Sequence, residues 1–292
     1  MPYRNASAGR DRGSLVQWSA PPPGSAPRAR VSTKEEPHQA IADKVAEGCD
    51  KETDVSSASE ASMAMMPAIS IDVRLQVWLS PSFPVGAFAF SHGLELAADR
   101  CWVHNRDSLE AWLRDLVELG SLRNDLILLA SAWRATAASD MAALLGVNEL
   151  ALALQPSAER RLETATQGTA FLATLAAAWP CPPLSAVSAR IAAEAALPVA
   201  VGAGTAAHAI DLEGTLHAFA MAFATNLVSA AIRLSIVGQT DGQRVIAALT
   251  LALQRQAAAA ATATLDTIGS ATLRSDLASL AHETQYSRLF RS

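Results

Sequence analysis

Apolar residues recur at intervals of three and four positions through most of the chain after about residue 70. Leu109, Trp112 and Leu116 share one face of a predicted helix. An apolar stripe with the same spacing runs from Leu216 to Leu234. No run of alternating polar and apolar residues is long enough to predict a β-sheet. The pattern therefore predicts an all-α fold, a single bundle of roughly eight to ten helices.

Capping and turn residues divide this pattern into separate helices. Pro81 and Pro84 end a first helix, because proline lacks a backbone donor and disfavours the helical conformation in the residue before it. Asp107 followed by Glu110 predicts a capping box at the start of another helix. A glycine-bracketed segment, 238–243, predicts a polar turn without the lysine of a phosphate-binding loop. The predicted helices cover residues 72–79, 107–120, 122–133, 159–178, 186–196, 204–214 and 215–237.

The composition changes near residue 66. All three lysines precede this point, and every later basic side chain apart from histidine is arginine. Residues 1–66 are rich in Ser, Pro, Gly and charge and poor in aromatic residues, so they cannot bury enough apolar surface to offset the entropy of ordering. The sequence therefore predicts a disordered extension over 1–66 and one helical domain over 67–292.

Charge and cysteine content narrow the class of protein. The net charge is −5 and the pI is near 5.7, which argues against a nucleic-acid-binding groove. The three cysteines are widely separated and odd in number, which indicates a reducing compartment rather than a disulfide framework. Two apolar stretches, 216–237 and 245–265, approach the length of a membrane span, but both contain polar or charged residues in their interior. We interpret them as buried helices and predict no membrane association.

The segment 80–95 contains the residues that most resemble a catalytic site. Ser91, His92 and Glu95 could form a hydrolase triad, but the strand-turn-helix context of a nucleophile elbow is missing. We therefore interpret His92 and Glu95 as a capping or helix-surface pair. The six histidines show no HxH or HExxH spacing, so no metal site is predicted. No catalytic residue and no cofactor are predicted.

Two other polar features leave alternatives open. Asn226, Ser229 and Arg233 form a polar line on an apolar helix, which suits the solvent face, a buried network or a partner interface. The last eleven residues, 282–292, combine aromatic, arginine and amide side chains that are typical of interface anchors. Since termini are ordered only when something holds them, this tail is either bound by a partner or folded back onto its own domain.

Four blocks, in order, resemble the UreF family of urease accessory proteins. They are residues 80–95 (SPSFPVGAFAFSHGLE), 159–172 (ERRLETATQGTAFL), 226–249 (NLVSAAIRLSIVGQTDGQRVIAAL) and 282–292 (HETQYSRLFRS). The resemblance covers the chain from about residue 75 to its end. The tail and the 226–249 block are the most specific of the four.

The resemblance implies a cytoplasmic protein that is not an enzyme and that acts in nickel insertion. Its implied partners are a UreD/UreH-type accessory protein, the GTPase UreG and apo-urease, and it implies a homodimer within a larger complex that couples GTP hydrolysis to nickel delivery. The alternative is a helical enzyme or small-ligand module that uses the Phe-rich loop 83–90 as a pocket. By motif, the expected partner-binding residues are Pro84, Gly86, Ser91, His92, Glu95, Arg233, Gln239, Gln243, His282, Glu283, Gln285, Tyr286, Arg288, Leu289 and Phe290.

Overall fold

A computed structural model describes residues 72–292, and the regular elements in that range are all helical. The predicted all-α fold is therefore confirmed. The extension predicted for 1–66 lies outside the described residues. The α-helices are α1 (Val73–Trp78), α2 (Leu94–Asp99), α3 (Arg106–Glu118), α4 (Ser121–Ala137), α5 (Met141–Ala153), α6 (Ala158–Ala178), α7 (Pro182–Ile191), α8 (Leu197–Ala207), α9 (Leu212–Arg233), α10 (Gln239–Ala260) and α11 (Leu273–His282), with 3-10 turns η2 (Ala87–Ala89) and η3 (Leu265–Thr267).

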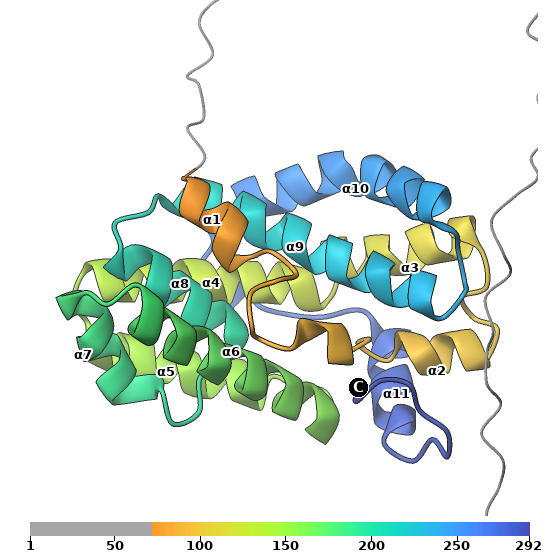
Figure 1. Ribbon diagram of the computed structural model, residues 1–292, viewed down its shortest axis with the longest axis horizontal. Helices are drawn as coiled ribbons and strands as arrows, with labels where there is room; N and C mark the ends of the chain where they lie inside the picture. Colours follow the sequence, from red (N-terminus) through yellow and green to blue (C-terminus); the bar gives the residue numbers. More distant parts are fainter. Residues whose placement is uncertain (1–71) are drawn as a thin grey trace, which may run out of the picture. The chain divides into compact units, whose positions relative to one another are not determined.

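The helices α4 and α8 lie at the centre of the bundle. The pair α9 and α10 runs along one side of them, and α5, α6 and α7 cover the other side (Figure 1). The short helix α2 and the last helix, α11, pack together at one end, below α3 in this view. The chain terminus returns to this same end, so residues near 90 and near 290 become neighbours.

Glycine allows the central helices to approach closely. A side-chain carbon on Gly202 of α8 would lie 2.3 Å from the carbonyl oxygen of Leu129 in α4. One on Gly168 of α6 would lie 2.1 Å from the carbonyl oxygen of Ala195, just before α8. Neither neighbour is a flexible side chain, so a larger residue would force the helices apart.

The start of α3 differs from the sequence-based expectation. Asn105, rather than Asp107, caps the helix: its side-chain oxygen accepts a hydrogen bond from the amide of Ser108 at 2.9 Å, and the Ser108 hydroxyl accepts one from the Asn105 amide at 3.0 Å. Asparagine is as good a cap as aspartate. Asp107 instead lies in the first turn, where its charge favours the helix N-terminus.

The boundaries near the two long helices were also predicted incorrectly. The predicted helix 204–214 is in fact the end of α8 at Ala207 and the start of α9 at Leu212, with a break between them. The polar segment 238–243 is not a turn, because α10 already begins at Gln239. At 238–243, glycine and polar residues in the first turn of α10 resemble a turn, whereas at 204–214 the alanine residues on both sides of His208 gave no signal for the break between α8 and α9.

Helix α9 is long and apolar enough to cross a bilayer by length and composition alone. Half of its most apolar 18-residue window is buried inside the domain, and the helix packs against α10 and α4. Both features are those of a core helix in a bundle.

We expect Gly202→Ala to destabilise the fold by about 3 kcal/mol, because the added methyl group overlaps the α4 backbone. Gly146→Ala is the matched control: this glycine is exposed on α5 with nothing within 4 Å of the added carbon. The control should gain about 0.5–1 kcal/mol from helix propensity. Urea unfolding followed by circular dichroism measures both, and equal effects of the two substitutions would contradict the close packing of α4 and α8.

Candidate functional site

The tail, residues 283–292, folds back onto the domain after α11. His282, the last residue of α11, is fully buried, and Phe290 and Ser292 are also buried. The amide of Ser91 donates a hydrogen bond to the carbonyl oxygen of Ser292 at 2.8 Å, and the Ser91 hydroxyl donates to the same oxygen. The tail is therefore folded back onto its own domain, which is the second of the two interpretations of this segment.

Glu95 in the first turn of α2 holds the tail in place. Its carboxylate accepts hydrogen bonds from the amides of Leu289 at 2.6 Å and Phe290 at 2.9 Å. The Nε2 atom of His282 lies 3.2 Å from the same carboxylate. Glu95 is therefore a buried acceptor for three donors, and its interpretation as a helix-surface partner of His92 was wrong.

Gly93 makes this arrangement sterically possible. It is the residue before α2 and has a φ of +74°, in the left-handed region that favours glycine. A side-chain carbon at this position would lie 2.8 Å from the backbone nitrogen of Ser279 in α11. The absence of a side chain lets α2 and α11 pack closely enough for Glu95 to reach the tail.

His282 joins α11 to the start of α6 as well as to α2. Its Nδ1 atom lies 2.6 Å from the carboxylate of Glu159, while its Nε2 atom faces Glu95. Arg288 in the tail reaches the other oxygen of Glu159 at 2.6 Å. The tail and three helices, α2, α6 and α11, thus share one ionic network.

A second buried carboxylate, Glu163 of α6, lies one turn further along. It pairs with Arg160, accepts a hydrogen bond from the Ser292 hydroxyl at 2.7 Å, and faces Nε2 of His92 at 2.7 Å. Burial alone would raise the pKa of Glu163, but Arg160 and the hydrogen-bond donors outweigh burial and lower this pKa to about 2. Burial, reinforced by Arg160, lowers the pKa of His92, so we take His92 as neutral near pH 7, with its proton on Nε2.

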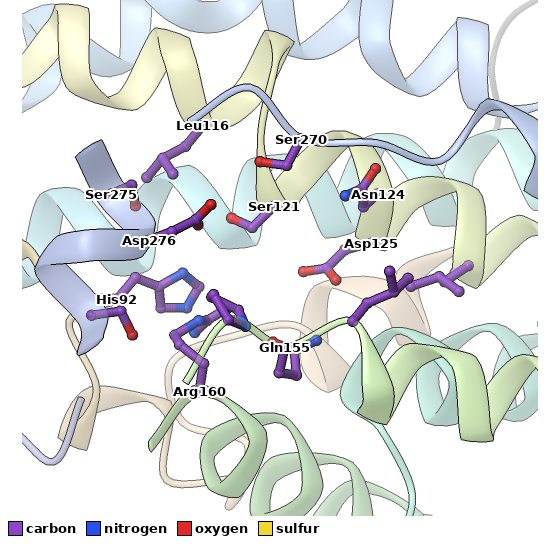
Figure 2. A pocket seen from close by; sticks show the side chains of 14 residues that line it. His92, Leu116, Ser121, Asn124, Asp125, Gln155, Arg160, Ser270, Ser275 and Asp276 are labelled. Carbon is purple, nitrogen blue, oxygen red and sulfur yellow. The ribbon is translucent and has the colours of Figure 1, made fainter. Parts of the chain in front are cut away.

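A polar cavity of about 70 Å³ lies behind this cluster, between α4, the start of α6 and α11. Figure 2 shows Asp125 and Ser121 of α4 on one side of it, Asp276 of α11 on another, and His92 and Arg160 near α6. The Nδ1 atom of His92 and the hydroxyl of Ser121 are buried without a hydrogen-bond partner. Burial raises the pKa of Asp125 to about 7, and Glu163 adds to this effect while Arg160 opposes it.

Arg233 lies at the end of α9, on the exposed face of the helix rather than in a buried network. Its guanidinium donates to the carbonyl oxygen of Phe88 and stacks on the ring of Phe290, 4.4 Å from the ring centroid. Through the hydrogen bond to Phe88 and the cation–π contact with Phe290, Arg233 links helix α9 to the 3-10 turn η2 and to the tail. Phe88 itself is exposed.

The structure brings together only part of the predicted partner-binding set. Ser91, His92, Glu95, His282 and Phe290 form the buried cluster, and Arg233 contacts it through Phe290. Gln239 and Gln243 are exposed on the first two turns of α10, outside this cluster. The remaining members are exposed or half-buried in the loop before η2 and in the tail: Pro84, Gly86, Glu283, Gln285, Tyr286, Arg288 and Leu289.

The sequence reasoning missed the charged residues with which these side chains pair. Glu159, Arg160 and Glu163 were recognised only as parts of a matching block, and Asp125 and Asp276 were not considered. Their signal was present, because four ionisable residues at 159–163 open a helix with few other charges. Charged residues at helical spacing in an apolar protein indicate paired, buried groups.

The cluster is suited to holding segments together rather than to chemistry. The Ser91 hydroxyl is directed at Ser292, and His92 at Glu163, so the two do not form a nucleophile and its base. In residues 72–292, no group of three or more His, Cys, Asp or Glu side chains is placed to hold a metal ion.

An exposed apolar stripe lies on the same end of the molecule. Leu273, Leu277 and Leu280 are spaced by four and three positions along α11 and are 69%, 50% and 46% exposed. In the tail, Tyr286 is fully exposed and Leu289 is 66% exposed. Apolar side chains that gather on one exposed helix face are typical of an interaction surface.

The fold and this cluster can now be compared with known proteins. A family model described as UreF matches residues 103–250. A urease accessory protein UreF from Methylobacterium radiotolerans is 53% identical over 229 residues, which cover 78% of this chain and 100% of that protein. One from Xanthobacter autotrophicus is 48% identical over 245 residues, covering 84% of this chain and 98% of that protein. The chain belongs to the UreF family.

In this UreF-family chain, Glu95→Ala should release the tail. The substitution removes the acceptor for two tail amides and a partner of buried His282, which should cost the tail about 3 kcal/mol of local stability. The exchange of the Leu289 and Phe290 amides with solvent, measured by NMR, should then accelerate about 100-fold. Glu149→Ala on the exposed face of α5 is the control. Unchanged exchange in Glu95→Ala would show that Glu95 does not hold the tail.

Glu163→Gln should be destabilising at pH 7 by about 3 kcal/mol, as its lowered pKa implies. A carboxylate with a lowered pKa stabilises the fold above its unfolded pKa, near 4.5, and loses this contribution as the pH falls toward 2. The difference between wild type and variant should therefore shrink between pH 4.5 and 2. Urea unfolding across this range measures it, with Glu149→Gln as the exposed control. A difference that does not change with pH would contradict the assignment.

Proposed function

We propose that this UreF-family chain acts in urease maturation as a bridge between a UreD/UreH-type protein and the GTPase UreG. In this role it couples GTP hydrolysis to nickel delivery into apo-urease. It works in the cytoplasm as a homodimer within the larger complex, without enzymatic activity or a resident cofactor of its own. Membership of the UreF family supports a role in urease maturation, and the exposed apolar groups on α11 and the anchored tail support the bridging role.

The observation that carries the proposal is the exposure of Tyr286 and Leu289 on a tail whose flanking residues are buried. His282 and Phe290 fix the two ends of this segment, so the exposed side chains are presented on a constrained backbone. The stripe of Leu273, Leu277 and Leu280 extends the apolar surface along α11. We assign this α11 stripe, with Tyr286 and Leu289, to the UreD/UreH-type partner.

Arg233 and the start of α10 supply a second candidate surface for the assembly. Arg233 is exposed and tied to η2 and the tail, and Gln239 and Gln243 are exposed where α10 begins. Polar and arginine side chains of this kind contribute to specificity at partner interfaces. We expect this surface to contact a different component from the one that covers the α11 stripe.

The alternative, a small-ligand pocket at the Phe-rich loop 83–90, gains no support from the packing. Phe83 is buried, with its ring 5.3 Å from that of Phe171 and 6.1 Å from that of Trp179. Phe90 is also buried, and Phe88 points outward. Phe83 and Phe90 therefore fill the core, and Phe88 lies on the surface, instead of the three rings lining a pocket.

Replacement of an apolar residue in the stripe tests the proposal directly. Leu277→Glu places a charge in the proposed interface and should reduce co-purification with the organism's own UreD/UreH-type protein by at least about 100-fold in affinity, a hot-spot loss. Leu251→Glu on α10 is the matched control, since Leu251 is also exposed, at 61%, but lies away from α11.

Light scattering of the purified mixture, with UreG, GTP and nickel present, would size the complexes. We expect two copies of this chain in the wild-type complex and in Leu251→Glu. Normal assembly by Leu277→Glu would overturn the assignment of the stripe. Absence of any complex with the wild-type chain, from a folded helical sample, would overturn the bridging function itself.

A further inference from the structure

The polar cavity plays no part in the proposed docking surface, yet it lies directly beneath it. Its lining includes Ser275, Asp276 and Ser279 of α11, the helix that carries the apolar stripe on its other face. On the opposite wall are Ser121, Asp125 and Leu128 of α4. The main packing partners of α11 are α2 and α6, so α11 faces the central helix α4 largely across this cavity.

The groups around the cavity carry more negative than positive charge. Asp125 faces the cavity from α4, and Asp276 faces it from α11. The pKa shifts of both carboxyl groups come from burial and nearby charges, without a contribution from hydrogen bonds. From α6, Arg160 is the nearby cation, but it is already paired with Glu163. His92, from the segment before α2, turns an unpartnered Nδ1 toward the cavity.

We propose that this cavity is a proton-operated latch for α11 and the tail. When Asp125 is protonated, α11 seats firmly against the bundle. When the proton leaves, the Asp125 carboxylate is charged in a poorly hydrated cavity beside Glu163, which favours the open state of α11 and its tail, in which water reaches this carboxylate. The step transfers one proton between the Asp125 carboxyl group and solvent.

The direction of the effect follows from the electrostatics of Asp125. Burial raises the pKa of Asp125 to about 7, against an ordinary value of 3.8 when the segment is open. A raised carboxyl pKa contributes stability below the ordinary value that is lost as the pH rises toward the folded value. Between pH 6 and pH 8 the ratio of open to seated α11 should therefore increase about tenfold.

Asp276 and His92 respond to the same surroundings. Burial also raises the pKa of Asp276, opposed by Arg160, and burial lowers the pKa of His92. Both shifts have the same cause, because burial disfavours the charged form of each group while α11 is seated. The latch is therefore a property of the cavity as a whole, and Asp125 is the member whose charge changes near neutral pH.

The test is amide hydrogen exchange of the full chain at pH 6, 7 and 8, expressed as protection factors so that the intrinsic pH dependence of exchange is removed. Amides of residues 273–292 should lose protection about tenfold from pH 6 to pH 8, while those of central helix α8 should not change. Asp125→Asn, which cannot ionise, should keep α11 protected throughout. Asp266→Asn on the exposed turn η3 is the control and should behave as wild type.

Unchanged protection of α11 in the wild type, or the same loss of protection in Asp125→Asn, would overturn the latch. Should Asp125→Asn fail to fold, the carboxyl ¹³C titration of wild-type Asp125 gives the answer. Its midpoint should lie near 7 and coincide with the titration of the α11 amide signals; a midpoint near 4 would refute the proposal.

Only the consequence of the latch for docking rests on the proposed function. A seated α11 presents the stripe on a fixed helix, so the UreD/UreH-type protein should bind more tightly at pH 6 than at pH 8, and this difference should vanish in Asp125→Asn. Loss of α11 protection without partner binding at any pH would support the latch and refute the docking assignment. Exchange needs no partner, so the two failures are distinguishable.

Discussion

The path of the last ten residues depends on the buried carboxylate of Glu95. A carboxylate taken out of water must receive several hydrogen bonds, and Glu95 receives them from the amides of Leu289 and Phe290 and faces the ring of His282. The dependence is mutual, because those amides would otherwise lack an acceptor. One side chain in the first turn of α2 thereby fixes both the end of α11 and the return of the tail.

The molecule is held together by two different kinds of packing. In the centre, Gly202 and Gly168 bring α8 against α4 and α6 through backbone contact, among apolar side chains and a few neutral hydrogen-bonded ones such as Asn148 and Thr164. At the α11 end, carboxylates, histidines and arginines are paired around a polar cavity. Apolar contacts change little with pH, whereas paired charges respond to it. The buried groups Glu163, Asp125 and His92, whose pKa values are shifted, therefore lie at the end that carries the exposed stripe.

The sequence was sufficient for the fold class because helical periodicity is a local signal, as at Leu109, Trp112 and Leu116. It failed at the start of α10, where Gly238 and the polar residues after it resemble a turn although they begin a helix. It also failed for Glu95, since the meeting of residues 95 and 290 depends on how α2 and α11 pack. The close approach at Gly93 that allows this contact has no signature in the local pattern.

An anchored tail lowers the entropic cost of binding a partner. A free peptide loses backbone and side-chain freedom when it binds, at a cost of about 1–2 kcal/mol for each backbone residue fixed. Here His282 and Phe290 are already buried, so most of that ordering has occurred within the chain before docking. Binding through Tyr286 and Leu289 would then gain apolar contact without the full entropic cost. In the proposed docking mode, anchoring and recognition are thus divided between neighbouring residues of one short segment, the buried ones serving the first and the exposed ones the second.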